Sequence, residues 1–343
     1  MIDALPIIDM IKDSARRHPK RIVLPESGEE RVLKAASQAS AEGVAIPILL
    51  GDPEDIEKTS GSLGIALKGI EILNPTVSDA LGEYVKTYCE LRSEKGVAEG
   101  LATRILSKSL YYGAMMVRVG DADGMVVGAA TLTASVIKAG HLIIGFQKDI
   151  TTPSSFFIMD TGNKDVGEDG ILFYADAAVN PDPTPEQLAD IAISSARSAR
   201  ALLGWEPRVA MLSFSTKGSA SHPAIDKVVK ATDIAKAKEP SLLIDGELQA
   251  DAALKIEVAR KKMKDPGAVA GKANVLIFPD LNSGNISYKL TQHVGGARAY
   301  GPILQGFAKP LSDLSRGAKV EEITGIMAIV SVLAQSTGKE QGR

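Results

Sequence analysis

The chain has 343 residues, of which 39 are Lys or Arg and 42 are Asp or Glu, giving a formal net charge of −3 at pH 7. That balance lacks the basic excess with which nucleic-acid-binding proteins neutralise phosphates, so we expect no nucleic-acid partner. Hydrophobic residues make up 45% of the chain and charged residues 24%, which is typical of a folded globular protein. At roughly 150 residues per domain, the length indicates about two domains.

The cellular location can be inferred from cysteine usage and from apolar runs. Cys89 is the single cysteine, so no internal disulfide forms and a reducing compartment is expected. Residues 1–20 lack the apolar stretch and small-residue cleavage site of a signal peptide. The longest apolar run, 323–334, is shorter than the roughly 18 residues of a membrane helix. We therefore expect a cytoplasmic protein with no membrane partner.

The first half of the chain alternates between strand and helix patterns. Residues 21–25 form a short β-rich run, 29–42 a helical stretch that ends at Gly43, and 46–50 a second strand. This βαβ unit implies parallel pairing with a right-handed crossover. Further along we expect helices at 77–91 and 97–109 and an apolar Gly-rich segment at 124–130. The first region is thus of the α/β class.

The second half repeats the alternation. The sequence predicts strands at 155–159, 171–175, 208–214, 242–244 and 274–278, and helices at 223–236 and 250–263. Another helix begins at Thr184, where Thr184 is the N-cap, Pro185 the first helical residue and Gln187 the partner in a capping box, and it ends at Gly204. The second region is also α/β. The tail from residue 302 holds a loop and an apolar helix that is expected to pack on the first region.

Common cofactor and metal motifs are missing from the sequence. No G-x-G-x-x-G opens a helix, and the P-loop-like run 267–273 is one residue too short and ends in Ala rather than a hydroxyl residue. The four histidines are far apart in sequence, which argues against a His-based metal site. We therefore expect no dinucleotide cofactor, no P-loop nucleotide and no His-bound metal.

Polar loops at strand ends are the first candidates for binding. The segment 280–285, with Asn282 and Ser283, follows a strand and leads into a helix, where free backbone N–H groups and the helix dipole favour an anion. A capped loop without ligand explains the same residues. The loop 213–219 also follows a strand, at the edge where open α/β sheets bind ligands, although turn chemistry accounts for its hydroxyls almost as well.

Three cations are further candidates, each with a structural alternative. Arg92 closes the helix predicted at 77–91, where it can simply oppose the helix dipole. Arg31 can be a solvated charge on its helix. Lys138 stands in the apolar stretch 136–144, which makes a charge there notable, but its ammonium group can extend to solvent.

The densest polar loop is 309–317, which contains Ser315 and Arg316 and is followed by Glu321 and Glu322. A hydroxyl donor, a guanidinium able to hold phosphate through two hydrogen bonds, and a carboxylate lie within eight residues. That set suits acyl transfer to or from phosphate. Alternatively, Ser315 is a turn residue and the two glutamates stabilise a helix N-terminus.

Several segments together make the chain resemble the phosphate acetyltransferase (phosphotransacetylase) family nearly from end to end. These segments are 23–26, 30–36, 120–124, 179–184, 208–219, 270–282 and 301–306. The resemblance implies two α/β/α domains similar to the isocitrate dehydrogenase-like fold, comprising residues 1–147 plus 302–343 and residues 148–301, with an active site in the cleft between them. It also implies a homodimer and reversible acetyl transfer between coenzyme A and phosphate through a ternary complex, without a metal.

The family's functional residues carry over to particular positions of this chain. The catalytic Ser-Arg pair falls on Ser315 and Arg316, and the catalytic acid falls on Glu322. Substrate-binding residues fall on Arg31, Arg92 and Lys138, to which we add Asn282 and Ser283 from the loop described above. Two positions depart from the usual pattern. The acid is commonly Asp, and Lys138 replaces an Arg, so it keeps the charge but lacks the planar guanidinium.

Two other functions fit the same resemblance. The first is a phosphate acyltransferase for a longer chain such as butyryl. The second is a domain that senses acetyl-CoA without turning it over, which the departures at Lys138 and Glu322 favour. The presence of Ser315 and Arg316 in a chain of this length favours an enzyme.

Overall fold

The computed structural model describes residues 7–340, which form two compact units. The first unit contains residues 7–147 and 307–340, and the second contains Lys148–Gly306. The chain therefore returns to the first unit after Gly306, further along than the sequence predicts. The reason is strand β10 (Arg298–Gln305), which pairs with β5 (Ser154–Asp160) as far as its last residue.

The first unit is built on a sheet of five parallel strands. Their order is β11-β4-β1-β2-β3, and all four pairings are parallel. The strands are β1 (Arg21–Leu24), β2 (Ile46–Leu50), β3 (Glu71–Leu73), β4 (Gly124–Val127) and β11 (Leu311–Asp313). Because the strands are parallel, the loops after β1, β4 and β11 meet at one edge of the sheet.

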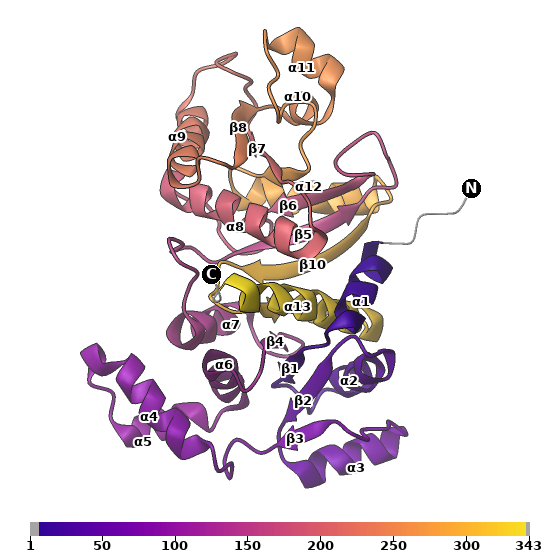
Figure 1. Cartoon of the computed structure of the whole chain (residues 1–343), viewed down its shortest axis with the longest axis vertical. Helices are drawn as coiled ribbons and strands as arrows, with labels where there is room; N and C mark the ends of the chain where they lie inside the picture. Colours follow the sequence, from indigo (N-terminus) through magenta and orange to yellow (C-terminus); the bar gives the residue numbers. More distant parts are fainter. Residues whose placement is uncertain (1–6, 341–343) are drawn as a thin grey trace. The chain divides into compact units, whose positions relative to one another are not determined.

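Helices cover both faces of this sheet. A Cβ on Gly124 in β4 would lie 2.6 Å from Val330 of α13 (Val320–Glu340), whereas Met125 approaches Gly113 of α6 (Ser109–Val119). Successive strand residues point to opposite faces, so α13 and α6 cover opposite sides. Figure 1 shows α13 beside α1 (Ile7–Arg17), and the Gln335 side-chain amide donates to the carbonyl of His18 at 3.0 Å. The apolar tail thus packs on the first unit.

The other helices of this unit connect the strands. They are α2 (Glu30–Glu42), α3 (Pro53–Leu63), α4 (Leu81–Leu91), the 3₁₀ turn η1 (Ser93–Lys95), α5 (Glu99–Leu106), α7 (Thr133–Ala139) and the π-helical turn η2 (Gly140–Ile144). Helix α2 ends at Gly43 with φ of 68°, as its sequence predicts. The single helix expected at 97–109 is wrong, because α5 ends at Leu106 and a new helix starts at Ser109.

The second unit has a mixed six-stranded sheet. The strand order is β10-β5-β6-β9-β7-β8, in which β10, β5 and β6 are antiparallel neighbours and the other pairs are parallel. The further strands are β6 (Ile171–Ala175), β7 (Arg208–Leu212), β8 (Leu243–Leu248) and β9 (Val275–Ile277). Its helices are α8 (Pro185–Leu203), α9 (Pro223–Lys238), α10 (Ala250–Leu254), α11 (Ile256–Lys262) and α12 (Leu281–His293).

The predicted capping box at the start of α8 is confirmed. The N–H of Gln187 donates to the Thr184 hydroxyl at 3.3 Å, and the N–H of Thr184 donates to the Gln187 side chain at 2.8 Å. Helix α8 is then buried along most of its length. Both units are of the α/β class, as predicted. Between residues 7 and 340, no helix combines the length and apolar character needed to cross a membrane.

Candidate active site

Ser315 and Arg316 lie in a tight turn at the end of β11. The N–H of Ala318 donates to the Ser315 carbonyl at 2.9 Å, and the N–H of Gly317 donates to the Ser315 hydroxyl at 3.3 Å. Both the Ser315 and the Arg316 side chains are exposed. The turn therefore presents a hydroxyl and a guanidinium to solvent at the carboxyl edge of the first sheet, beside the loops after β1 and β4.

Arg31 supports this turn from the start of α2. Its Nη1 donates to the carbonyl of Arg316 and to the carbonyl of Ala318, both at 2.9 Å. Its Nη2 donates to the Glu29 carboxylate at 3.2 Å. The predicted substrate-binding arginine is thus in direct contact with the backbone of the Ser315–Arg316 turn. In this geometry its guanidinium fixes the turn, and its contact with substrate stays a prediction.

Arg31→Lys separates these two roles. An ammonium group keeps the charge but cannot hold two carbonyls and a carboxylate in one plane. If the chain catalyses the acetyl transfer that the family resemblance implies, we expect Lys and Gln at this position to lower its turnover number alike, by about tenfold or more, because small displacements of reacting groups are costly. The control is Arg21→Lys. Arg21 likewise contacts both a backbone carbonyl and a carboxylate, those of Gly120 and Asp123. Full activity of Arg31→Lys would show that charge alone is needed.

Glu322 is the third residue of helix α13. Its Oε2 accepts a hydrogen bond from the N–H of Lys319 at 2.9 Å, which is the backbone half of a capping box. The carboxylate is exposed, and Glu322 follows Arg316 by six residues. The structure therefore gives Glu322 the capping role that the sequence offered as the alternative. That role leaves Oε1 for proton transfer.

Lys138 and Arg92 lie on other elements of the first unit. Lys138 is exposed in the last turn of α7, so its charge reaches solvent despite the apolar stretch around it. Arg92 is the C-cap residue of α4, the position at which a cation opposes the helix dipole. Arg31 bonds to the backbone of the Ser315–Arg316 turn, and Glu322 bonds to Lys319 just after that turn. Among the described residues, no hydrogen bond joins Arg92 to this turn.

Asn282 and Ser283 belong to the second unit, in the first turn of α12. The Asp280 side chain caps the helix by accepting from the N–H of Ser283 at 2.8 Å, and the Ser283 hydroxyl donates to the Asp280 carbonyl at 2.8 Å. Asn282 is exposed. Since both donors of Ser283 are engaged within the cap, an anion there would compete with the carboxylate of Asp280.

The loop 213–219 is likewise held by internal bonds. The Ser215 hydroxyl donates to the buried carboxylate of Glu247 at 3.0 Å, and the N–H of Gly218 donates to the same oxygen at 2.7 Å. Lys217 donates to the Asp245 carboxylate at 2.5 Å. These contacts with strand β8 engage the Ser215 hydroxyl and the Lys217 ammonium group within the protein.

Two carboxylates beside the Ser315–Arg316 turn were not identified from the sequence. Glu26, just after β1, accepts from four successive N–H groups, those of residues 128–131, at 2.7 to 2.9 Å. Asp313, the last residue of β11, is 2% exposed and accepts from the Thr133 hydroxyl at 2.5 Å. Burial, together with the charge of Glu26, raises the pKa of Asp313 to about 6. For Glu26 the available signal is its place two residues after strand β1, whereas Asp313 lies within the three-residue strand β11 and has no such signal.

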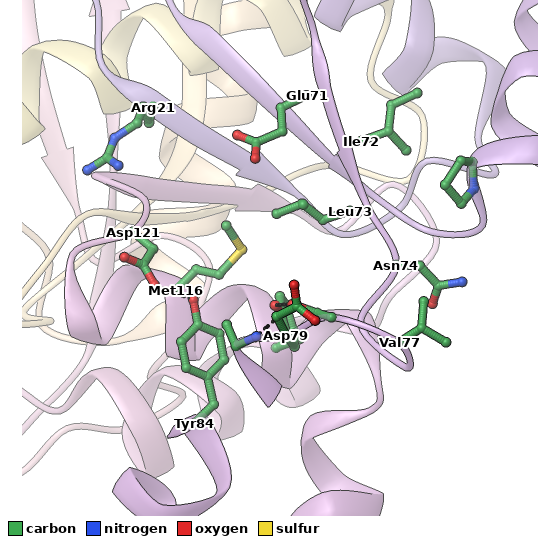
Figure 2. A pocket seen from close by; sticks show the side chains of 14 residues that line it. Arg21, Glu71, Ile72, Leu73, Asn74, Val77, Asp79, Tyr84, Met116 and Asp121 are labelled. Carbon is green, nitrogen blue, oxygen red and sulfur yellow. Dashed lines mark hydrogen bonds between the residues drawn. The ribbon is translucent and has the colours of Figure 1, made fainter. Parts of the chain in front are cut away.

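A pocket of about 590 Å³ lies elsewhere in the first unit, along the edge strand β3. Figure 2 shows Glu71, Asp79, Tyr84 and Asp121 around it, and the hydroxyl of Tyr84 donates to the Asp121 carboxylate. Burial and this bond raise the pKa of Tyr84 well above its usual range. None of the eight predicted site residues lines this pocket, so it is not part of the cluster around Ser315.

Comparisons with known proteins cover almost the whole chain. The family model "Phosphate acetyl/butaryl transferase" matches residues 6–331. A phosphate acetyltransferase of Thermoanaerobacterium thermosaccharolyticum is 48% identical over 332 residues, which is 96% of this chain and 100% of that protein.

Solved structures give the same result. A phosphotransacetylase from Streptococcus pyogenes has a TM-score of 0.90 and 39% identity, covering 96% of this chain and 98% of that one. The EutD phosphotransacetylase from Staphylococcus aureus has a TM-score of 0.87 and 40% identity, with the same coverage. With an α/β fold of this kind and sequence identity extending over both units, the chain belongs to the phosphate acetyl/butaryl transferase family.

Proposed function

We propose that this protein is a phosphate acetyltransferase, which catalyses reversible acetyl transfer between acetyl-CoA and phosphate through a ternary complex. The observation that supports this most directly is the exposed Ser315–Arg316 turn, fixed by Arg31 and followed by the carboxylate of Glu322. The relatives at 39 to 48% identity are named phosphate acetyltransferase or phosphotransacetylase. The proposal includes no metal and no cofactor, and coenzyme A is a substrate.

The reaction begins with the coenzyme A thiol. A thiol titrates near 8.5, and the thiolate is the competent nucleophile. In the proposed mechanism Oε1 of Glu322 accepts the thiol proton, while Oε2 keeps its bond to the N–H of Lys319. The capping bond gives this base a defined orientation, because it ties the carboxylate to the helix start.

The thiolate then attacks the carbonyl carbon of acetyl phosphate. A carbon–sulfur bond forms, the bond from carbon to the phosphate oxygen breaks, and phosphate leaves with the electron pair. The Ser315 hydroxyl donates to the carbonyl oxygen, on which negative charge develops. Arg316 binds the departing phosphate through its guanidinium. In the reverse direction phosphate attacks acetyl-CoA. We propose that Arg92, Lys138, Asn282 and Ser283 bind parts of the substrates.

The test is a direct assay of acetyl-CoA formation from acetyl phosphate and coenzyme A. Butyryl phosphate is the matched competitor, because the family model names both acyl groups. We expect a kcat/KM at least about tenfold higher for acetyl phosphate, since two extra methylenes change pocket binding by about 1 to 3 kcal/mol each. A preference for butyryl phosphate would make the protein a phosphate butyryltransferase. Transfer from neither acyl phosphate would refute the proposal.

Arg316→Gln tests the phosphate role directly. Hydrogen bonds to charged groups contribute about 1.5 to 3 kcal/mol, so we expect KM for acetyl phosphate and for phosphate to rise about 10- to 100-fold. KM for coenzyme A should change little. Lys319→Gln is the control, because Lys319 is an exposed cation three residues away. Equal losses for all three substrates would indicate a structural role for Arg316.

We also propose a homodimer in the cytoplasm. Helix α12 and its C-cap residue expose three apolar side chains, those of Ile286, Leu290 and Val294, at 56%, 55% and 80% of their surfaces. The spacing of four residues places them on one face of the helix, and exposed apolar patches mark association surfaces. The proposed partner is a second copy of the chain. Analytical ultracentrifugation at several protein concentrations measures the mass of the particle and so tests for a dimer. A reducing compartment matches the single cysteine, Cys89.

A further inference from the structure

Asp313 is a buried carboxyl that the mechanism above does not use. It lies two residues before Ser315, is 2% exposed, and its Oδ1 has no hydrogen-bond partner within the described part of the chain. Burial raises its pKa to about 6, so ionising this group in the fold is unfavourable. An apolar residue of similar size would fill the same space without that penalty. Its presence there therefore needs a reason other than stability.

The contact of Asp313 joins two elements of the first unit. Its Oδ2 accepts from the hydroxyl of Thr133 at 2.5 Å, and Thr133 is the first residue of α7. Helix α7 carries Lys138 near its other end. The acceptor of this hydrogen bond thus lies on strand β11, which leads into the Ser315–Arg316 turn. The donor lies on helix α7, which also carries Lys138, a predicted substrate-binding residue.

The loop between β4 and α7 is held between two carboxylates. Glu26 accepts from the four N–H groups of residues 128–131. On the other side, a Cβ on Gly128 would lie 2.1 Å from Oδ1 of Asp313 and 2.5 Å from the backbone nitrogen of Leu314. Gly128 also has φ of +119°, which disfavours other residues. The loop thus packs tightly against the backbone immediately before Ser315.

We infer that Asp313 is a positioning residue, which fixes the Ser315–Arg316 turn to the start of helix α7 through the hydroxyl of Thr133. The inference rests on the proposed function, in which this turn supplies the hydroxyl donor and the phosphate ligand. Asp313 acts through Thr133 and the backbone, and does not touch the substrate. Together with the bonds from Arg31 to the carbonyls of Arg316 and Ala318, it holds the turn at both ends.

Thr133→Val is the decisive variant, because it keeps the shape and removes the hydroxyl. We expect the turnover number for acetyl transfer to fall about tenfold or more, since a displacement of about 1 Å can cost 100-fold. KM for both substrates should stay within about threefold, because groups that bind them remain. Thr133→Ser restores the hydroxyl and should retain at least about half of the parent turnover number.

Thr232→Val is the matched control. Thr232 is a 2% exposed threonine of the second unit whose hydroxyl donates to the Val228 carbonyl, so the variant also loses a hydrogen-bonded hydroxyl. We expect it to lower thermal stability without lowering turnover. A double variant tests whether the two residues act together. Asp313→Ala/Thr133→Val should be no slower than Asp313→Ala alone, because each change removes the same hydrogen bond. If Asp313→Ala does not fold, the Thr133 variants decide.

A readout independent of activity is amide hydrogen exchange in the turn. The N–H groups of Gly317 and Ala318 bond to Ser315, and we expect them to exchange about tenfold faster in Thr133→Val than in the parent or in Thr232→Val. Unchanged exchange and unchanged turnover would overturn the inference, as would equal losses in Thr133→Ser and Thr133→Val. A parent that forms no acetyl-CoA refutes the proposed function, and exchange then still decides whether Thr133 holds the turn.

Discussion

We expect Ser315→Ala to lower the turnover number of acetyl transfer about 100-fold, the usual effect of removing one donor to a developing oxyanion. The apparent KM values should change much less, because the proposed hydrogen bond strengthens only in the transition state. Ser315 is exposed, and within residues 7–340 its hydroxyl accepts only a long bond of 3.3 Å from the N–H of Gly317. Its loss should therefore leave the fold intact. Steady-state kinetics with acetyl phosphate and coenzyme A measure both quantities.

Ser315→Thr is the matched variant for this prediction. It keeps the hydroxyl donor and the bond to Gly317, and the exposed position leaves room for the methyl group. Activity that is substantially higher in Thr than in Ala would assign the effect to the hydroxyl. Unchanged turnover in Ser315→Ala would remove Ser315 from the mechanism, whereas equal losses in both variants would indicate that the turn itself was disturbed.

The parts of the fold that could be predicted are those whose signals are local. The capping box of Thr184 and Gln187 and the left-handed glycines Gly43 and Gly204 lie next to the residues that they affect. Strand β6 (Ile171–Ala175) is an apolar run that needs no distant information, and its bounds were predicted without error. Short-range sequence patterns therefore located most of the long elements in both units.

The parts that were missed depend on distant contacts. Strand β11 has three residues and pairs with β4 far earlier in the chain, so no pattern within it identifies a strand. The helix predicted at 250–263 is interrupted at Lys255. There a Cβ on Gly271 would lie 2.4 Å from Cα of Ile256, which shows how closely another segment packs against the break. Tertiary packing decides both cases.

The candidate site shows the same division. Residue types within a short stretch make the loop 309–317 and the two glutamates after it a candidate, and the family resemblance assigns the roles of Ser315, Arg316 and Glu322. The bonds from Arg31 to the carbonyls of Arg316 and Ala318 join residues 285 and 287 positions apart, and nothing in the sequence near Arg31 indicates them. Asp313 gives no such signal, because a carboxyl in a polar loop segment is more often a turn residue than a buried acceptor.

Glu322→Gln is expected to have the largest effect of all the variants. If the carboxylate accepts the thiol proton, the amide cannot, and the turnover number should fall roughly 100- to 10,000-fold. Gln at the third helical position still accepts from the N-cap N–H, so the bond from Lys319 and the stability of α13 should be kept. Binding of coenzyme A should persist, which calorimetry measures. Glu321→Gln is the control, because Glu321 is an exposed neighbour on the same helix turn.

Glu322→Asp tests the departure from the acid that is common in the family. The shorter side chain withdraws the carboxylate by about 1.5 Å unless the backbone moves, and such a displacement can cost on the order of 100-fold. In this chain the carboxylate is fixed by its 2.9 Å bond from the N–H of Lys319, a geometry that suits the length of Glu. We therefore expect the Asp variant to be impaired relative to the parent and more active than the Gln variant.

The three proteins measured side by side also decide between an enzyme and a sensor of acetyl-CoA. If the protein is a transferase, acetyl-transfer activity is highest in the parent, lower in Glu322→Asp and lowest in Glu322→Gln, and all three proteins bind coenzyme A. A sensor gives binding without acetyl transfer in the parent, and neither substitution changes that. Comparable activity in Gln and the parent would exclude Glu322 as the base and leave it the capping role that its bond to Lys319 already shows. Because Gln preserves that cap, a loss of turnover in the Gln variant can be assigned to proton transfer and not to the helix.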